Sequence, residues 1–132
     1  MPKNIDELLT QARQALSRLD ARVAHEHIRG GSVIVDIRSM EQCVQDGFIP
    51  GAVWVERNVL EWRADPTSRW NDPRIARRDV PVIIMCNEGY QSSLCAATLR
   101  EFGLPATDVI GGFQAWIAYG LPTLPRQSTF IG

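Results

Sequence analysis

The sequence has few cysteines, no large excess of positive or negative charge, and no long apolar run. Its 132 residues include three cysteines, an odd number that argues against a disulfide framework and fits a reducing compartment. The net charge is -1 and the arginines are spread along the chain, so we expect no nucleic-acid partner. No apolar run approaches the roughly eighteen residues of a membrane span, and the polar N-terminus has no apolar signal core. We therefore expect a cytoplasmic protein without a membrane partner.

The sequence also has only two histidines, and it contains no internal repeat and no Gly/Ser linker. His25 and His27 form no zinc-ligand spacing with the cysteines, and we interpret them as surface or packing residues. The sequence thus predicts neither a metal nor another cofactor. Apolar residues make up 45% of the chain, enough for one domain with its own core. We expect an N-terminal helix packed on the domain at residues 1–19, the domain itself at 20–123 and a tail at 124–132.

Short apolar strands alternate with amphipathic helices, a pattern typical of an α/β domain with a mainly parallel sheet. Strands are predicted at residues 33–37, 52–55, 80–85 and 108–110. Helices are predicted at residues 5–19, 24–29, 39–46, 92–102 and 113–119. Residues 56–79 are expected to form a long, partly helical connection. Its Trp62 and Trp70 are either core residues or part of a partner-binding surface.

Cys86 directly follows the predicted strand at 80–85, and a helix begins soon after it. In open parallel sheets ligands bind beyond the carboxyl ends of the strands, where the next helix offers free N–H groups and a positive dipole end. Gly89 lets the backbone curl so that successive N–H groups face inward, as in an anion-binding nest. This position predicts a stabilised, nucleophilic thiolate. The alternative, a small buried hydrophobic residue, is what we expect of Cys43 and Cys95.

Four motifs occur in the order and spacing of a known family. They are Val35-Asp36-Ile37-Arg38, Gly47-Phe48-Ile49-Pro50-Gly51-Ala52, Cys86-x-x-Gly89-x-x-Ser92 and Gly111-Gly112-Phe113-x-x-Trp116. Each motif is weak alone, but four in order are specific. Over about residues 20–123 the chain resembles the rhodanese-like family of sulfurtransferases.

The resemblance implies both a fold and a reaction. The fold is a central parallel five-stranded sheet flanked by helices on both faces. In the reaction, Cys86 carries sulfane sulfur as a persulfide, from a thiosulfate or (poly)persulfide donor to a thiol, including a protein thiol, or to cyanide. The cradle around the sulfur would be formed by Asn87, Glu88, Gly89, Tyr90, Gln91 and Ser92. Asp36 and Arg38 match the D-x-R element and are expected to support the site, Asp36 by bonding loop amides or Arg38.

The chain departs from the family pattern in its loop. Asn87 and Gln91 occupy places where thiosulfate-using members often carry basic residues, and Glu88 adds a negative charge. A dianionic donor should therefore bind less well than a persulfide or polysulfide. A related phosphatase would need an arginine at position 91 to clamp phosphate, so Gln91 argues against that activity. The remaining alternative is a non-catalytic or redox-sensing rhodanese-like binding module.

Overall fold

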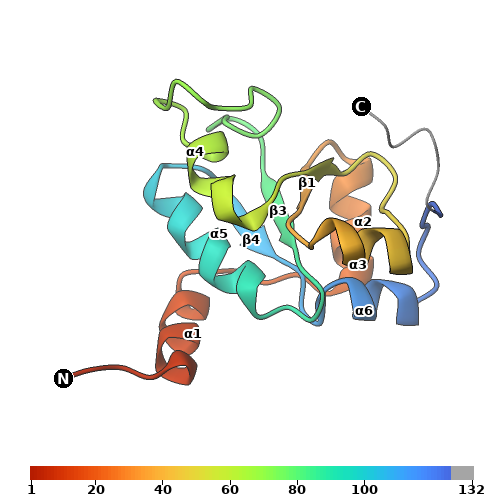
Figure 1. The fold of residues 1–132 in the computed structure, drawn as a ribbon, viewed down its shortest axis with the longest axis horizontal. Helices are drawn as coiled ribbons and strands as arrows, with labels where there is room; N and C mark the ends of the chain where they lie inside the picture. The colour runs from red at the N-terminus through yellow and green to blue at the C-terminus, as the bar shows by residue number, and fades with distance from the viewer. Residues whose placement is uncertain (126–132) are drawn as a thin grey trace.

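Four parallel strands form the centre of the fold in a computed structural model that describes residues 1–125 (Figure 1). They follow the order β2-β1-β3-β4. Their bounds are β1 (Val33–Asp36), β2 (Val53–Trp54), β3 (Val82–Met85) and β4 (Ala106–Asp108). In the register, Val35 of β1 lies between Val53 of β2 and Ile84 of β3. The predicted α/β class with a parallel sheet is confirmed.

The sheet has four strands where five were expected. At its β4 edge, Leu19 is the only residue among positions 1–125 that pairs, through a parallel bridge to Val109. The Leu19 amide donates to the Asp108 carbonyl at 3.0 Å, and the Ile110 amide donates to the Leu19 carbonyl at 2.8 Å. The next helix begins at Ala21, so the chain leaves the edge after one paired residue. The fifth position exists as a bridge that is too short to count as a strand.

Helices cover both faces of the sheet. In chain order they are α1 (Ile5–Gln14), α2 (Ala21–Arg29), α3 (Met40–Asp46), the 3-10 turn η1 (Arg57–Val59), α4 (Leu60–Ala64), α5 (Gln91–Glu101) and α6 (Gly112–Ala118). In Figure 1, α1, α4 and α5 lie on one side of the strands, and α2, α3 and α6 lie on the other. The first helix ends at Gln14 instead of near Leu19, because Leu19 is extended and pairs with the sheet edge.

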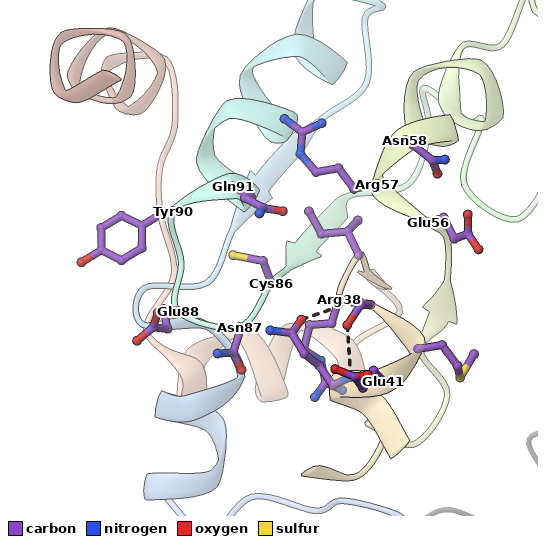
Figure 2. A pocket seen from close by; sticks show the side chains of 14 residues that line it. Arg38, Glu41, Glu56, Arg57, Asn58, Cys86, Asn87, Glu88, Tyr90 and Gln91 are labelled. Carbon is purple, nitrogen blue, oxygen red and sulfur yellow. Dashed lines mark hydrogen bonds between the residues drawn. The ribbon is translucent and has the colours of Figure 1, made fainter. Parts of the chain in front are cut away.

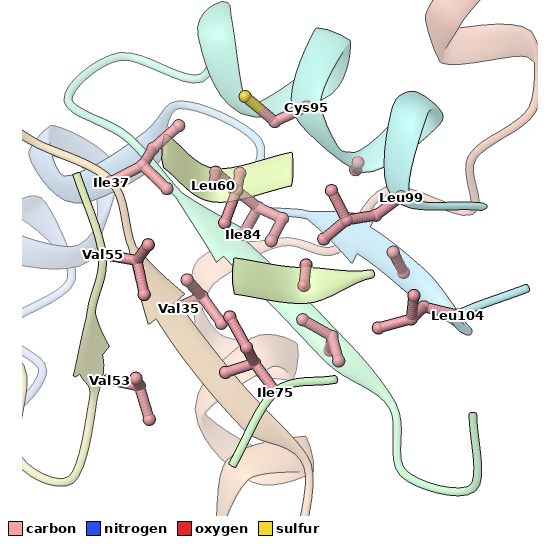
Figure 3. Packing of buried hydrophobic residues seen from close by; sticks show 14 of the residues in the cluster. Val35, Ile37, Val53, Val55, Leu60, Ile75, Ile84, Cys95, Leu99 and Leu104 are labelled. Carbon is pink, nitrogen blue, oxygen red and sulfur yellow. The ribbon is translucent and has the colours of Figure 1, made fainter. Parts of the chain in front are cut away.

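The two central strands, β1 and β3, are buried on both faces, and their residues alternate between two hydrophobic clusters. Val35 and Ile84 face the cluster on the α4 and α5 side, which Figure 3 shows with Leu60 and Leu99. The neighbouring residues of β1 and β3 face the opposite cluster, which includes Phe113 of α6. Burying a side chain of this size stabilises the fold by about 1.5 to 3 kcal/mol. These clusters hold the carboxyl ends of β1, β2 and β3 in fixed relative positions.

The sequence left open whether Trp62 and Trp70, in the connection between β2 and β3, are core residues. Trp62 and Trp70 are 57% and 58% exposed, so neither is a core residue. The connection is anchored instead by the fully buried Ile75.

Part of the predicted C-terminal tail is paired. Leu124 forms an antiparallel bridge with Phe48, while the rest of the tail, residues 126–132, lies outside the described residues. No helix within residues 1–125 has both the length and the apolar character needed to cross a membrane.

Candidate active site

Cys86 is the first residue after β3, and its sulfur lies at the floor of an open cavity of about 670 Å³ (Figure 2). Two backbone amides donate to this sulfur: the N–H of Gly89 at 3.1 Å and the N–H of Ser92 at 3.3 Å. Both belong to the loop that leads into α5. Donors aimed at the sulfur stabilise negative charge there, whether it is carried by a thiolate or by a persulfide.

Two glycines allow this loop to close around the sulfur. Gly89 has φ +87°, and a Cβ at this position would lie 2.8 Å from the Gly111 nitrogen. Gly112 has φ +58°, and its Cβ would lie 2.5 Å from the Cys86 carbonyl oxygen. That oxygen accepts from the Phe113 amide at 2.8 Å, so the first turn of α6 holds the base of the loop. The motif at 111–116 therefore contributes directly to the site.

A buried carboxylate fixes the loop from beneath. Asp108, at the end of β4, is fully buried and accepts from the hydroxyls of Ser92 and Ser93, each at 2.7 Å. Arg18 donates to both oxygens of the same carboxylate, at 2.9 and 3.1 Å. The start of α5 is thus tied to β4 and to the segment before α2. This network orients the Ser92 amide that reaches Cys86.

Two arginines from the N-terminal part of the chain bind the loop backbone. The Gly89 carbonyl oxygen accepts from Arg13 at 2.8 Å and from Arg18 at 3.0 Å. Arg13 also donates to the Ser93 hydroxyl at 3.1 Å. The carbonyl of Gly89 therefore points away from the sulfur while its amide points toward it. Helix α1, which packs on α5, takes part in shaping the active-site loop.

The cavity has a second wall formed by segments that follow β1 and β2. From β1 comes the start of α3, where Ser39 and Gln42 form a reciprocal capping box. From β2 come Glu56, Arg57 and Asn58. In Figure 2 the guanidinium of Arg57 extends over the cavity toward α5, on the same side as Gln91. Both walls thus stand at the carboxyl ends of parallel strands.

The predicted loop side chains differ in how they lie. Tyr90 is 59% exposed and points outward in Figure 2, with the Arg13 guanidinium 5.7 Å from its ring centroid. Glu88 and Gln91 are exposed at the rim. The Asn87 side chain accepts from Gln114 of α6 at 2.9 Å. The loop therefore presents backbone N–H groups to the sulfur, and its side chains line the entrance.

Asp36 and Arg38 form a buried ion pair with each other. Arg38 donates to the Asp36 carboxylate with distances as short as 2.7 Å and to the Gly47 carbonyl at 2.9 Å. Its guanidinium also lies 3.6 Å from the centroid of the Phe113 ring. Although Arg38 lines the cavity, its charge is matched by Asp36. The pair holds the end of β1 against α3 and α6.

The other two cysteines are buried thiols. Burial raises the pKa of Cys43 to about 12, with a further contribution from the Asp36 carboxylate, which accepts from the thiol at 3.8 Å. Burial likewise raises the pKa of Cys95 to about 12, and the Arg57 charge acts in the opposite direction. All three cysteines are free thiols, and within residues 1–125 no three potential metal ligands gather.

Several site residues were not predicted from the sequence. Arg57 could have been, since it follows the predicted strand at 52–55 by two residues, and the carboxyl ends of strands are where ligands bind. Asp108 was predicted to begin a strand, but it ends β4 instead. Arg13 and Arg18 carried no sequence signal, because their role depends on packing between distant segments.

Comparisons with known proteins agree on one family. The family model for the rhodanese-like domain matches residues 15–119. A tRNA sulfurtransferase of Desulfurococcus amylolyticus is 31% identical over 93 residues, which are 70% of this chain. The chain spans only 16% of that protein's length. Thiosulfate sulfurtransferase 16, chloroplastic, of Arabidopsis thaliana is 26% identical over 111 residues, 81% of this chain and 92% of that protein.

Solved structures show the same fold. A Rhodopseudomonas palustris protein of unknown function, described as a possible tyrosine phosphatase, has a TM-score of 0.85 and 32% identity. That match covers 93% of this chain and 96% of the other. The polysulfide-sulfur transferase homodimer of Wolinella succinogenes has a TM-score of 0.68 and 21% identity, and it covers 92% of this chain and 88% of its own. At this identity, the similarity to the Wolinella succinogenes protein shows the fold alone.

Proposed function

The chain belongs to the rhodanese-like domain family, and from that premise we propose that it is a sulfurtransferase that carries sulfane sulfur on Cys86. One observation carries the proposal. The Cys86 sulfur lies at the floor of an open cavity and accepts hydrogen bonds from the amides of Gly89 and Ser92. The same donors can hold either a thiolate or the persulfide formed from it.

The reaction has two displacement steps. In the first, the Cys86 thiolate attacks the sulfane sulfur of thiosulfate or of a persulfide, and a sulfur–sulfur bond forms as the donor's own sulfur–sulfur bond breaks. Sulfite or a thiolate leaves with the bonding electron pair. In the second, a thiol or cyanide attacks the outer sulfur of the Cys86 persulfide and takes it away. Cys86 is restored as a thiolate, so no cofactor is consumed.

The loop backbone supplies electrostatic stabilisation in both steps. The negative charge on sulfur moves outward by one atom when the persulfide forms, and it stays next to the loop that supplies the Gly89 and Ser92 amides. Fixed donors do not need to reorganise during the reaction, which is why such sites accelerate charge transfer. Asp108, Arg18 and Arg13 contribute by holding these donors in place.

The first step is tested by mass spectrometry of the purified protein. After treatment with polysulfide, and separately with thiosulfate, the peptide that contains Cys86 should gain one sulfur atom. Cys86→Ser should gain none. If neither donor adds sulfur and only peroxide modifies Cys86, giving a sulfenic acid, the redox-sensing alternative replaces the transferase.

The phosphatase description of the Rhodopseudomonas palustris structure calls for a separate control. A phosphatase of this kind needs a guanidinium in the loop itself to clamp phosphate at two oxygens. Here Gln91 occupies that place, and Arg57 reaches the cavity from the other wall. We expect no hydrolysis of a phosphotyrosine peptide. Turnover of that peptide lost in Cys86→Ser would contradict the proposal.

A further inference from the structure

Arg57 differs from the other arginines near the loop in having no partner. Arg13, Arg18 and Arg38 each donate to a carboxylate, a carbonyl or a hydroxyl. No hydrogen bond or ion pair to the Arg57 side chain occurs among residues 1–125. The residue is half-buried in the wall of the cavity that contains Cys86. A cation placed in this way can bind an anion that enters the cavity.

The position of Arg57 is set by rigid elements. It is the first residue of η1, directly after the segment that leaves β2. The Val55 amide donates to the Asp36 carbonyl at 3.0 Å, and the Leu60 side chain on the far side of η1 is fully buried. The Arg57 charge also acts on α5, because it is the strongest influence that lowers the pKa of the buried Cys95, whose pKa burial raises. Cys95 lies on α5, the helix that the active-site loop enters.

The remaining charges in the cavity are negative. Glu41, Glu56 and Glu88 line it and are exposed, while Arg38 is already paired with Asp36. One unpaired cation thus stands among three carboxylates. Binding of one anionic group to Arg57 is favoured. A second negative charge on the same ligand would be repelled by these carboxylates.

We infer that Arg57 is the donor-binding residue of this site, and that it holds the one carboxylate of a persulfide donor whose S–SH group is protonated. The Cys86 thiolate attacks the outer sulfur of that group, and the donor's inner sulfur leaves as a thiolate. This inference rests on the proposed function and narrows its donor to a persulfide of a small thiol in preference to thiosulfate. Arg57 thereby takes the place of the basic residues that the loop lacks at Asn87 and Gln91.

The first test measures anion preference without any sulfur transfer. Iodoacetate is an anion and iodoacetamide is neutral, but both alkylate the same Cys86 thiolate, so the ratio of their rates is independent of how much thiolate is present. In Arg57→Gln this ratio should fall about fivefold, the effect of one nearby charge at short range. Arg57→Lys should retain most of the ratio. High salt should shrink the difference.

Arg29→Gln provides the matched control. Arg29 is exposed at the end of α2, just before β1 begins. It therefore lies at the amino ends of the strands, whereas the cavity lies at their carboxyl ends. Its substitution removes the same charge from the chain and should leave the ratio unchanged. Circular dichroism of each variant establishes that it is folded. An unchanged ratio in folded Arg57→Gln overturns the inference.

The second test uses the donors themselves. The concentration of a small-thiol persulfide needed to half-load Cys86 should rise about tenfold in Arg57→Gln, the loss expected for one hydrogen bond to a charged group. Wild-type protein should load faster from this monoanion than from thiosulfate. Glu88→Gln should narrow that difference, and Gln91→Arg added to Arg57→Gln should restore thiosulfate use.

The outcomes separate the two proposals. If wild-type protein loads sulfur and Arg57→Gln does so equally well, the donor-binding role is wrong and the sulfurtransferase stands. If wild-type protein takes sulfur from no donor but the alkylation ratio still depends on Arg57, the sulfurtransferase fails and the anion-binding role stands. If thiosulfate loads faster than the persulfide, the preference for a monoanion is wrong.

Discussion

The two walls of the Cys86 cavity are built in opposite ways. The loop wall is fixed by hydrogen bonds: its backbone is held by Arg13, Arg18 and the first turn of α6, and the hydroxyls of Ser92 and Ser93 are held by Asp108. The opposite wall presents charged side chains, among them Arg57, that have no partners within residues 1–125. We infer from this difference that the two walls have different roles. The loop wall fixes the reacting sulfur, and the opposite wall is free to select what approaches it.

The largest effect should come from removing the carboxylate beneath the loop. Asp108→Asn replaces a charge that accepts from Arg18, Ser92 and Ser93, and leaves a partly buried guanidinium unmatched. We expect a loss of about 3 to 4 kcal/mol in the free energy of unfolding, as for other broken buried ion pairs. Denaturant unfolding measures it. Glu56→Gln in the opposite wall should change stability by less than about 0.5 kcal/mol. Equal losses in the two variants would contradict the comparison.

A smaller effect should follow from crowding the base of the loop. In Gly112→Ala the new Cβ would lie 2.5 Å from the Cys86 carbonyl oxygen, at a φ of +58°. We expect a loss of about 2 to 4 kcal/mol, from strain in a left-handed conformation and from overpacking. Sulfur loading of Cys86 should fall with it.

Gly120→Ala is the control for the backbone strain alone. Gly120 has φ +70°, and nothing lies within 4 Å of its Cβ position. Its substitution should cost about 1 kcal/mol, the strain term without the clash. If the two alanine variants are equally stable, the close approach between Gly112 and the loop is not what shapes the site.

The last effect appears only at alkaline pH and concerns the cysteines that lie outside the cavity. Because burial raises the pKa of Cys43 and Cys95 to about 12 from an ordinary value of 9.0, the folded protein keeps their protons more tightly than the unfolded chain does. Their contribution to stability is therefore complete below pH 9 and is lost as the pH rises toward 12. Unfolding measured across this range should show the decline, and Cys95→Ala should flatten it. A decline of the same slope in Cys95→Ala would show that this thiol is not its source.

The sequence predicted the parts of the site that depend on local geometry. The four motifs gave the family and the α/β sheet, because strand, turn glycine and helix follow one another within each motif. The boundaries were weaker. The first helix ends five residues early, since pairing of Leu19 with the sheet edge overrides the helical pattern, and the same short pairing leaves four strands in place of five.

The sequence did not reveal which charges would meet. Arg13 and Arg18 lie more than seventy positions from Gly89, so only the folded chain shows that they share its carbonyl. The loop motif by itself indicated a site with little positive charge. Arg57 is not part of that motif, because it reaches the cavity from the end of β2. Charge at an active site is a property of all the segments that converge there, and a motif covers only one of them.

The central claim, that Cys86 accepts and passes on sulfur, is tested most directly by following one labelled sulfur atom. The protein is loaded from a persulfide or thiosulfate whose outer sulfur is isotopically labelled, freed of donor, and then treated with cyanide. The account predicts one labelled sulfur on the Cys86 peptide before cyanide and the same label in thiocyanate afterwards. Thiocyanate that forms equally well with Cys86→Ser, or label that stays on the protein, would contradict it.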